Sequence, residues 1–218
     1  MEQEEALYKV LKETIIASKN IRFEGDGYSD EWKEEALNRG LTNICHVPEA
    51  ILKFNDPQSR SVLIGENIFN DNELKSRVEV ELEKYTKKVQ IESRILGDLA
   101  INHIVPTAVI YQNRLLENLR GLRETFSPEE YEMLGADRRE LVKEIQLHIL
   151  EIKKLVYEMT EARKISNHLE SEIKKAYSYQ EMVSPYLEKI REHIDHLELE
   201  IDDEIWPLPK YRELLFTK

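Results

Sequence analysis

The sequence predicts a mostly α-helical protein, built as a bundle of long antiparallel helices that resembles a coiled coil. Only seven Gly and seven Pro occur among 218 residues, about half of the usual combined share of these turn formers. Charged residues make up 34% of the chain, which is typical of helices with wide solvated faces. Apolar residues also recur with helical spacing over long stretches. Together these observations favour long helices over a sheet.

The N-terminal part predicts short helices. Residues 2–18 should form the first, because five of its residues fall on one stripe: Leu7, Val10, Leu11, Thr14 and Ile15. Ser29 is a suitable cap for a second helix, and Gly40 follows its expected end at Arg39. The segment between these helices contains Gly25-Asp26-Gly27, which lacks the remaining glycines and lysine of a phosphate-binding loop and predicts a turn.

The next segment predicts one more short helix. Pro48 suits the first turn of a helix that reaches about residue 54. Residues 55–65 are expected to be irregular, and residues 61–64 could pair briefly as a strand.

From residue 70 the pattern changes to long helices. Asn70 and Glu73 have the spacing of a capping box, and helical periodicity then runs toward Ile104. Pro106 should kink or interrupt this helix, because proline lacks a backbone donor and clashes with the preceding turn. Periodicity resumes as far as Leu122.

Ser127 and Pro128 predict the start of a further helix, with an end at Gly135. An unbroken heptad seam is then expected along a rod of about 40 residues and roughly 60 Å. Its positions are Leu141, Ile145, His148, Ile152, Leu155, Met159, Ala162, Ser166, Leu169, Ile173 and Ala176. Ser184 and Pro185 should start the last helix. The short connection makes these two helices antiparallel neighbours.

The C-terminal tail is rich in large apolar side chains. Two prolines end the last helix, yet six packing or interface residues follow: Trp206, Leu208, Tyr211, Leu214, Leu215 and Phe216. Leaving all six in water would forfeit on the order of 10 kcal/mol. We therefore expect the tail to dock on its own bundle or on a neighbouring subunit.

Composition also excludes several functions. The chain has 43 acidic and 31 basic residues, a net charge of −12, which argues against nucleic-acid and anionic-membrane partners. No apolar run is long enough to span a bilayer, and the first thirty residues do not resemble a secretory signal. The single cysteine, Cys45, fits a reducing compartment. These features predict a cytoplasmic protein.

No catalytic, cofactor-binding or metal-binding residue is predicted. His193 and His196 could chelate a metal at their i, i+3 spacing, but two ligands do not make a site, and solvated or boundary histidines are favoured. His148 lies in the seam, where a polar residue more often sets register. The acidic run at residues 202–204 points in three directions on a helix and predicts a solvated helix end.

Three stretches together resemble one family, the C-terminal portion of type III glutamine synthetase. They are RFEGDGYSDEW at residues 22–32 with RGL at 39–41; IESRILGD at 91–98 with NHIVPTA at 102–108 and YQN at 111–113; and DDEIWPLPKYRELLF at 202–216. VPEAIL at 47–52 and IFND at 68–71 also resemble the last segment shared by glutamine synthetases generally. The part after about residue 90 is similar to the extension peculiar to type III.

The resemblance implies a parent enzyme that joins ammonia to glutamate with ATP and magnesium, assembled as a dodecamer of two stacked hexameric rings. Residues 1–70 would then complete the catalytic domain and residues 71–218 would form the type III helical domain. The family's metal-binding carboxylates, glutamate-binding arginines and nucleotide contacts lie upstream of this segment. The chain is therefore expected to be a truncated or separated C-terminal part that is inactive alone.

Two functions stay open at this point. The first is a structural part that braces the catalytic domain and contacts other subunits. The second is a stand-alone helical adaptor whose exposed apolar face binds a different protein. The uncapped start of the first helix favours the structural part, because a self-contained module more often begins with a cap or a disordered tail.

Overall fold

The computed structural model describes the chain from Glu2 to Phe216, apart from the side chains of residues 2, 3, 211 and 212. The described residues form helices, turns and loops but no β-strand, which confirms the predicted fold class. The chain divides into two compact units, with the boundary after Cys45.

The first unit contains α1 (Glu2–Ala17), a 3₁₀ turn at Lys19–Ile21 and α2 (Asp30–Asn38). Ser29 caps α2 as predicted, because its hydroxyl accepts a hydrogen bond from the Trp32 amide at 3.3 Å. Gly40 follows α2 with a φ of 73°, a conformation that favours glycine. The Phe23 and Trp32 rings pack with centroids 4.7 Å apart.

The second unit begins with α3 (Val47–Leu52), a 3₁₀ turn at Lys53–Asn55 and α4 (Pro57–Leu63). The expectation of an irregular segment with a short strand at residues 61–64 is wrong, since most of this stretch is α4. Pro57 occupies the first turn of α4, where its fixed φ favours a helix.

The first long rod of the bundle consists of α5 (Asp71–Leu99) and α6 (Val105–Thr125), joined by the π-turn η3 (Ala100–Ile104). The predicted capping box is confirmed: the Asn70 side chain accepts from the Glu73 amide at 2.9 Å, and the Glu73 carboxylate accepts from the Asn70 amide at 2.8 Å. Pro106 would clash with the carbonyl four residues earlier, and that carbonyl lies in the wider π-turn. The π-turn therefore accommodates Pro106, and the rod continues as a helix on both sides of this turn.

The second rod is α7 (Pro128–Asn167), which has 40 residues. Its capping box of Ser127 and Glu130 is present, but the predicted end at Gly135 is wrong. Gly135 is buried within α7, and a Cβ atom there would lie 3.1 Å from Leu119 Cδ2. The glycine thus lets α6 and α7 approach closely instead of ending the helix.

The third rod consists of α8 (Glu172–Ser178), the π-turn η4 (Tyr179–Val183) and α9 (Ser184–Glu200). The prediction of an unbroken seam through Ala176 is wrong, because α7 ends at Asn167 and the chain reverses over residues 168–171. α9 begins at Ser184 as predicted, but it continues from α8 through η4. The carbonyl four residues before Pro185 again lies in the π-turn.

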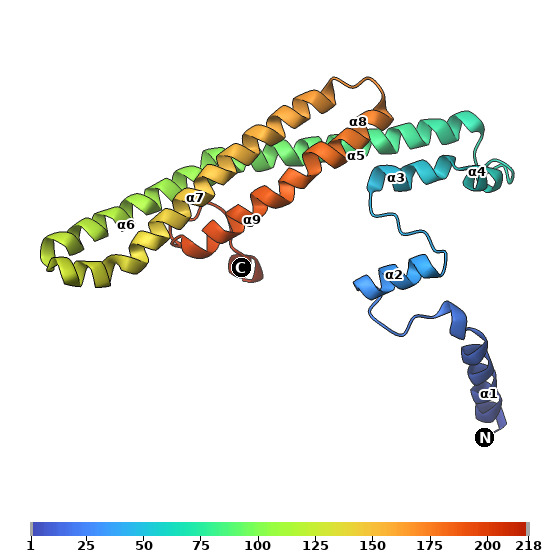
Figure 1. Ribbon diagram of the computed structural model, residues 1–218. Coiled ribbons are helices and arrows are strands. Elements are labelled where there is room, and N and C mark those ends of the chain that lie inside the picture. Colours follow the sequence, from blue (N-terminus) through green and yellow to red (C-terminus); the bar gives the residue numbers. More distant parts are fainter. Residues whose placement is uncertain (1, 217–218) are drawn as a thin grey trace. The chain divides into compact units, whose positions relative to one another are not determined.

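The three rods lie side by side in the described part of the second unit, and α7 runs antiparallel to both neighbours (Figure 1). A large core cluster fills most of the space between them, and a smaller cluster of Val78, Leu82 and Ala176 lies between α5 and α8. The buried members of the large cluster are Val89, Ala100, Ile104, Ala108, Ile145, Ile149, Ile152, Leu155, Met159, Ala162, Tyr179, Val183, Ile190, Ile194, Leu197, Ile201 and Trp206. The last two belong to the segment after α9, which ends in α10 (Tyr211–Leu215).

Candidate assembly surfaces

The segment after α9 folds back on the bundle. Trp206 is 8% exposed and belongs to the core cluster, and Ile205 and Leu208 are partly buried against the same cluster. The Lys210 ammonium donates to the Glu198 carbonyl at 2.7 Å, which satisfies one of the free carbonyls at the end of α9. Arg114 of α6 pairs with Asp202 at 3.2 Å. These contacts hold residues 201–210 against the bundle.

The end of the tail presents apolar side chains to solvent. Leu214 and Leu215 are about 60% exposed and Phe216 is 76% exposed, so these three predicted packing residues do not bury their side chains in this chain. The side chain of Tyr211, a fourth member of the predicted set, lies outside the described residues. Whether α10 contacts another subunit stays a prediction.

Helix α1 is a second exposed apolar surface. Six of its large apolar side chains are between 51% and 67% exposed: Leu7, Tyr8, Val10, Leu11, Ile15 and Ile16. Four of the five residues in the predicted stripe are among them, so the stripe exists, and no described residue of the first unit covers it. Burying a large aliphatic side chain is favourable by about 1.5–3 kcal/mol, so such a stripe is typical of an interface.

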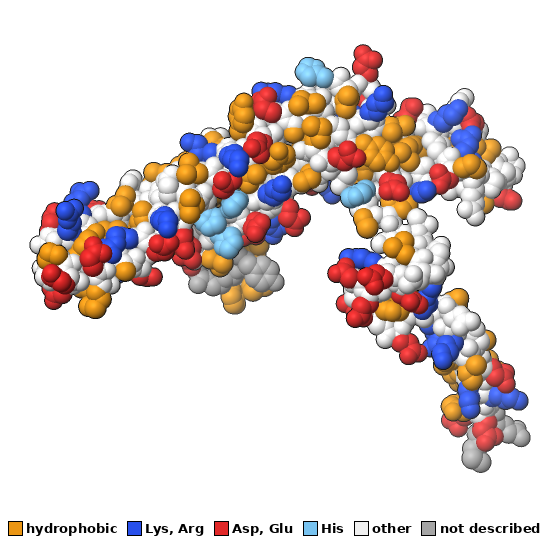
Figure 2. Space-filling model, viewed as in Figure 1, with side chains coloured by type: hydrophobic (Ala, Val, Ile, Leu, Met, Phe, Trp, Pro, Cys, Tyr) orange, Lys and Arg blue, Asp and Glu red, His pale blue; other side chains and the backbone are white. Residues whose placement is uncertain are grey.

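A third surface lies in the second unit, where α3 meets α5 and apolar side chains gather (Figure 2). A hollow of about 370 Å³ there is lined mainly by Ile51, Phe54, Phe69, Leu74 and Val78. The Arg77 guanidinium lies 4.8 Å from the centroid of the Phe69 ring, so this cation covers one side of the aromatic surface.

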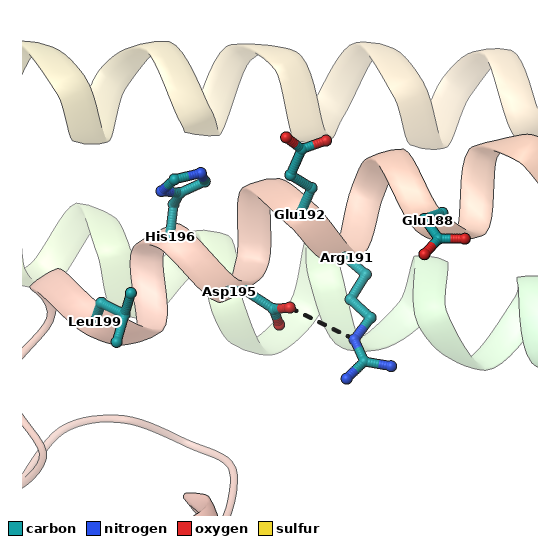
Figure 3. A pocket seen from close by; sticks show the side chains of 6 residues that line it. All are labelled: Glu188, Arg191, Glu192, Asp195, His196 and Leu199. Atoms are coloured by element: carbon teal, nitrogen blue, oxygen red, sulfur yellow. Dashed lines mark ion pairs between the residues drawn. The ribbon is translucent and has the colours of Figure 1, made fainter. Parts of the chain in front are cut away.

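Histidines gather where α7 and α9 lie side by side (Figure 2). The Nδ1 atoms of His148 and His193 are 2.9 Å apart, a hydrogen-bond distance. The His196 ring stacks on His148, with centroids 5.1 Å apart. A hollow of about 600 Å³ along α9 includes His196, and Figure 3 shows His196 and Glu192 pointing toward α7, whereas Arg191 and Asp195 point away.

Desolvation has the largest effect on the pKa of His148. Burial lowers the pKa of His148, the neighbouring imidazoles of His193 and His196 lower it further, and Glu144 partly opposes them. The sequence placed His148 on the seam and His193 on the last helix, but it did not predict their contact. The sequence does place histidines on two helices that are expected to be antiparallel neighbours. This pattern predicts a particular contact only when the register of the two helices is known.

The other motifs have structural roles. The Gly25–Gly27 segment turns around Asp26, whose carboxylate accepts from the Tyr28 amide at 2.9 Å. The carboxylate of Asp202 accepts from the Glu204 amide at 3.0 Å, which orders the chain just after α9. Among the described residues, no group of three or more histidine, cysteine or acidic side chains could hold a metal ion. No described helix is both long and apolar enough to cross a membrane.

Comparisons with known proteins identify the family. The family model for the glutamine synthetase C-terminal domain matches residues 6–123, more than half of the chain. A glutamine synthetase from Bacteroides fragilis (strain YCH46) is 70% identical over 99% of this chain and 30% of its own length. A type-3 glutamine synthetase from Dictyostelium discoideum is 31% identical over 98% of this chain and 29% of its own length.

A glutamine synthetase from Butyrivibrio fibrisolvens is 28% identical, again over 30% of its length. The chain thus spans about 30% of the length of each of these curated relatives. The resemblance drawn from the sequence is confirmed by these matches. The chain belongs to the glutamine synthetase C-terminal domain family and corresponds to a C-terminal portion of the type III enzymes.

Proposed function

We propose that the chain is the structural and assembly part of a type III glutamine synthetase, the enzyme that joins ammonia to glutamate with ATP. The observation that carries this proposal is the exposed apolar stripe of α1, in a chain that spans only 30% of its relatives. A partner surface must cover this stripe, and the remaining 70% of such an enzyme supplies one. Residues 1–70 would complete the catalytic domain.

The proposed role of residues 71–218 is to brace the catalytic domain and to contact other subunits of a homo-oligomer. Support comes from the continuous core of the three rods, which makes the bundle a rigid element, and from the apolar side chains of α10. The resemblance to type III enzymes implies a cytoplasmic dodecamer of two stacked rings. α10 is the surface we assign to a contact between subunits.

The reaction itself is proposed to take place on residues outside this chain. Phosphoryl transfer needs carboxylates that converge on metal ions and cationic groups that contact the phosphate. The upstream part of the enzyme is proposed to supply those groups and to bind ATP and magnesium. This chain would then affect catalysis only by positioning the domain and holding the oligomer together.

The assembly role can be tested in a chimera in which these 218 residues replace the matching part of the Bacteroides fragilis enzyme. Leu11→Asp places a charge in the stripe of α1, and we expect it to prevent α1 from packing in the catalytic domain. The subunits would then be misfolded, so the oligomer that sedimentation velocity detects for the unsubstituted chimera should be lost. The variant is expected to have this effect because removing a carboxylate from water into an apolar contact is strongly unfavourable.

Lys9→Asp is the matched control, because it introduces the same residue on α1 where the residues one turn away on either side are Glu5 and Glu13. We expect the Lys9→Asp chimera to sediment as the unsubstituted chimera does. If Leu11→Asp also assembles normally, α1 is not covered by the rest of the enzyme. The adaptor alternative would then be favoured.

A further inference from the structure

The contact between His148 and His193 depends on a single proton. Their Nδ1 atoms are 2.9 Å apart, so one nitrogen must donate and the other must accept. A neutral imidazole has one donor and one acceptor nitrogen, whereas a protonated imidazole has two donors. The pair can therefore hold this hydrogen bond while it is neutral or carries one extra proton, but not when both rings are protonated.

A third imidazole increases the effect of added protons. His196 stacks on His148 with ring centroids 5.1 Å apart, so a charge on either ring disfavours a charge on the other. His148 comes from α7 and the other two from α9, which are separate rods of the bundle. Repulsion within the cluster therefore acts across a helix interface.

Carboxylates lie close to the cluster on its own helices. Glu144 of α7 is the acidic side chain that favours a charged His148. On α9, Glu192 points toward α7 beside His196 (Figure 3). Asp195 forms an ion pair with Arg191 at 3.5 Å and points away from α7. Even so, burial and the two imidazoles outweigh Glu144.

The elements packed against α7 and α9 also carry polar and charged side chains, and some of these have partners outside the histidine cluster. From α6, the uncharged Gln112 donates to the Val142 carbonyl at 2.9 Å, and Arg114 pairs with Asp202 of the segment after α9. From α5, Glu92 lines a hollow together with Glu188 of α9, near the opposite end of that helix from His196. The titratable groups of the two π-turns are His103 in η3 and Tyr179 and Glu181 in η4.

We propose that His148, His193 and His196 form a proton-sensitive contact that holds α7 against α9 near neutral pH and weakens when the cluster is fully protonated. The bundle would then lose rigidity in mildly acidic surroundings. This device concerns the bundle itself and does not require the proposed role in the enzyme.

The direction of the pH dependence follows from linkage. The folded state lowers the pKa of His148, so the unfolded chain binds its proton more tightly. The stability that this group contributes is fully present above the ordinary histidine pKa of about 6.5. It is lost as the pH falls below that value toward the lower pKa of the folded state.

Thermal unfolding of the 218-residue chain between pH 7.5 and pH 5.5 tests the proposal, because ordinary carboxylates stay ionised in this window. We expect Tm of the unsubstituted chain to fall roughly twice as far over this window as that of His148→Gln or His193→Gln. A glutamine cannot gain a proton. His168→Gln is the matched control, since His168 is exposed at the end of α7, and it should show the full fall.

A second measurement does not depend on the variants folding. In the unsubstituted chain, we expect nuclear magnetic resonance to show that His148 titrates below the ordinary histidine value of about 6.5. A midpoint for His148 at or above that value would overturn the proposal, as would equal falls in Tm for all the chains. A drop in Tm at pH 7.5 on adding EDTA would also overturn it, because the cluster would then hold a metal ion.

Discussion

Trp206→Ala is expected to lower the free energy of unfolding by about 3–5 kcal/mol, the usual cost of removing a buried large aromatic side chain. For a chain of this size, that loss corresponds to a fall in Tm of roughly 10 °C. Trp206 is 8% exposed and packs in the core cluster with Ile201, and its ring also lies 5.9 Å from the Lys210 ammonium. Thermal and urea unfolding measure the change.

Phe216→Ala is the matched control, because Phe216 is 76% exposed, and we expect its unfolding free energy to change by less than about 0.5 kcal/mol. Truncation after Glu204 should cost at least as much as Trp206→Ala, since it removes Ile205 and Leu208 as well. An unchanged Tm for Trp206→Ala would mean that the tail does not dock on the bundle in solution.

Tyr179→Ala is expected to cost about 3–5 kcal/mol as well. Tyr179 is fully buried in η4, and burial raises the pKa of its hydroxyl, which therefore stays protonated and can donate. It donates to the side-chain Oδ1 of Asn167 at 2.6 Å, and the side-chain amide of Gln90 donates to the Tyr179 hydroxyl at 3.2 Å and to Asn167 Oδ1 at 3.0 Å. The three side chains tie η4 to α5 and to the end of α7.

Tyr179→Phe removes the hydroxyl and keeps the ring, so it measures the contribution of the hydroxyl to the free energy of unfolding by itself. We expect it to cost only about 1 kcal/mol, because the Gln90 amide still reaches Asn167. Tyr157→Ala serves as a control, since Tyr157 lies on α7 and is 67% exposed. If urea unfolding gives similar values for Tyr179→Ala and Tyr157→Ala, Tyr179 does not stabilise the connection between the rods.

Local signals in the sequence predicted most of the helix starts. Ser29, the box of Asn70 and Glu73, and Ser127 all cap helices at the expected positions, because a cap depends on residues only a few positions apart. Glycine is common just after helix ends, so the sequence predicts such an end at Gly135. Its actual role depends on Leu119 of another helix, a contact that a local pattern does not contain.

The position of the chain reversal was harder to predict. The heptad spacing continues by coincidence from Ser166 to Leu169 and on to Ala176, although the turn at residues 168–171 separates two rods. Ala162 before the turn and Tyr179 after it belong to the same core cluster, so the apolar spacing alone does not show the break. The contact of His148 with His193 could not be predicted for the same reason, since it depends on the register that this turn sets.

The exposed surfaces were predicted in part. The stripe on α1 was visible in the sequence, because helical spacing defines a face. Which faces stay uncovered depends on tertiary packing and, under the proposed function, on the rest of the enzyme. The apolar side chains of Trp206 and Phe216 therefore looked alike in the sequence, although only Trp206 is buried.

The most direct test of the account is an assay of glutamine formation from glutamate, ammonia, ATP and magnesium. We expect the isolated 218-residue chain to form no glutamine above the background without protein, whereas the Bacteroides fragilis chimera described above should be active. The reason is that, under the proposed function, the residues that perform the reaction lie in the upstream part of the enzyme. Turnover by the isolated chain, purified in parallel from a host lacking its own glutamine synthetase, would contradict the account.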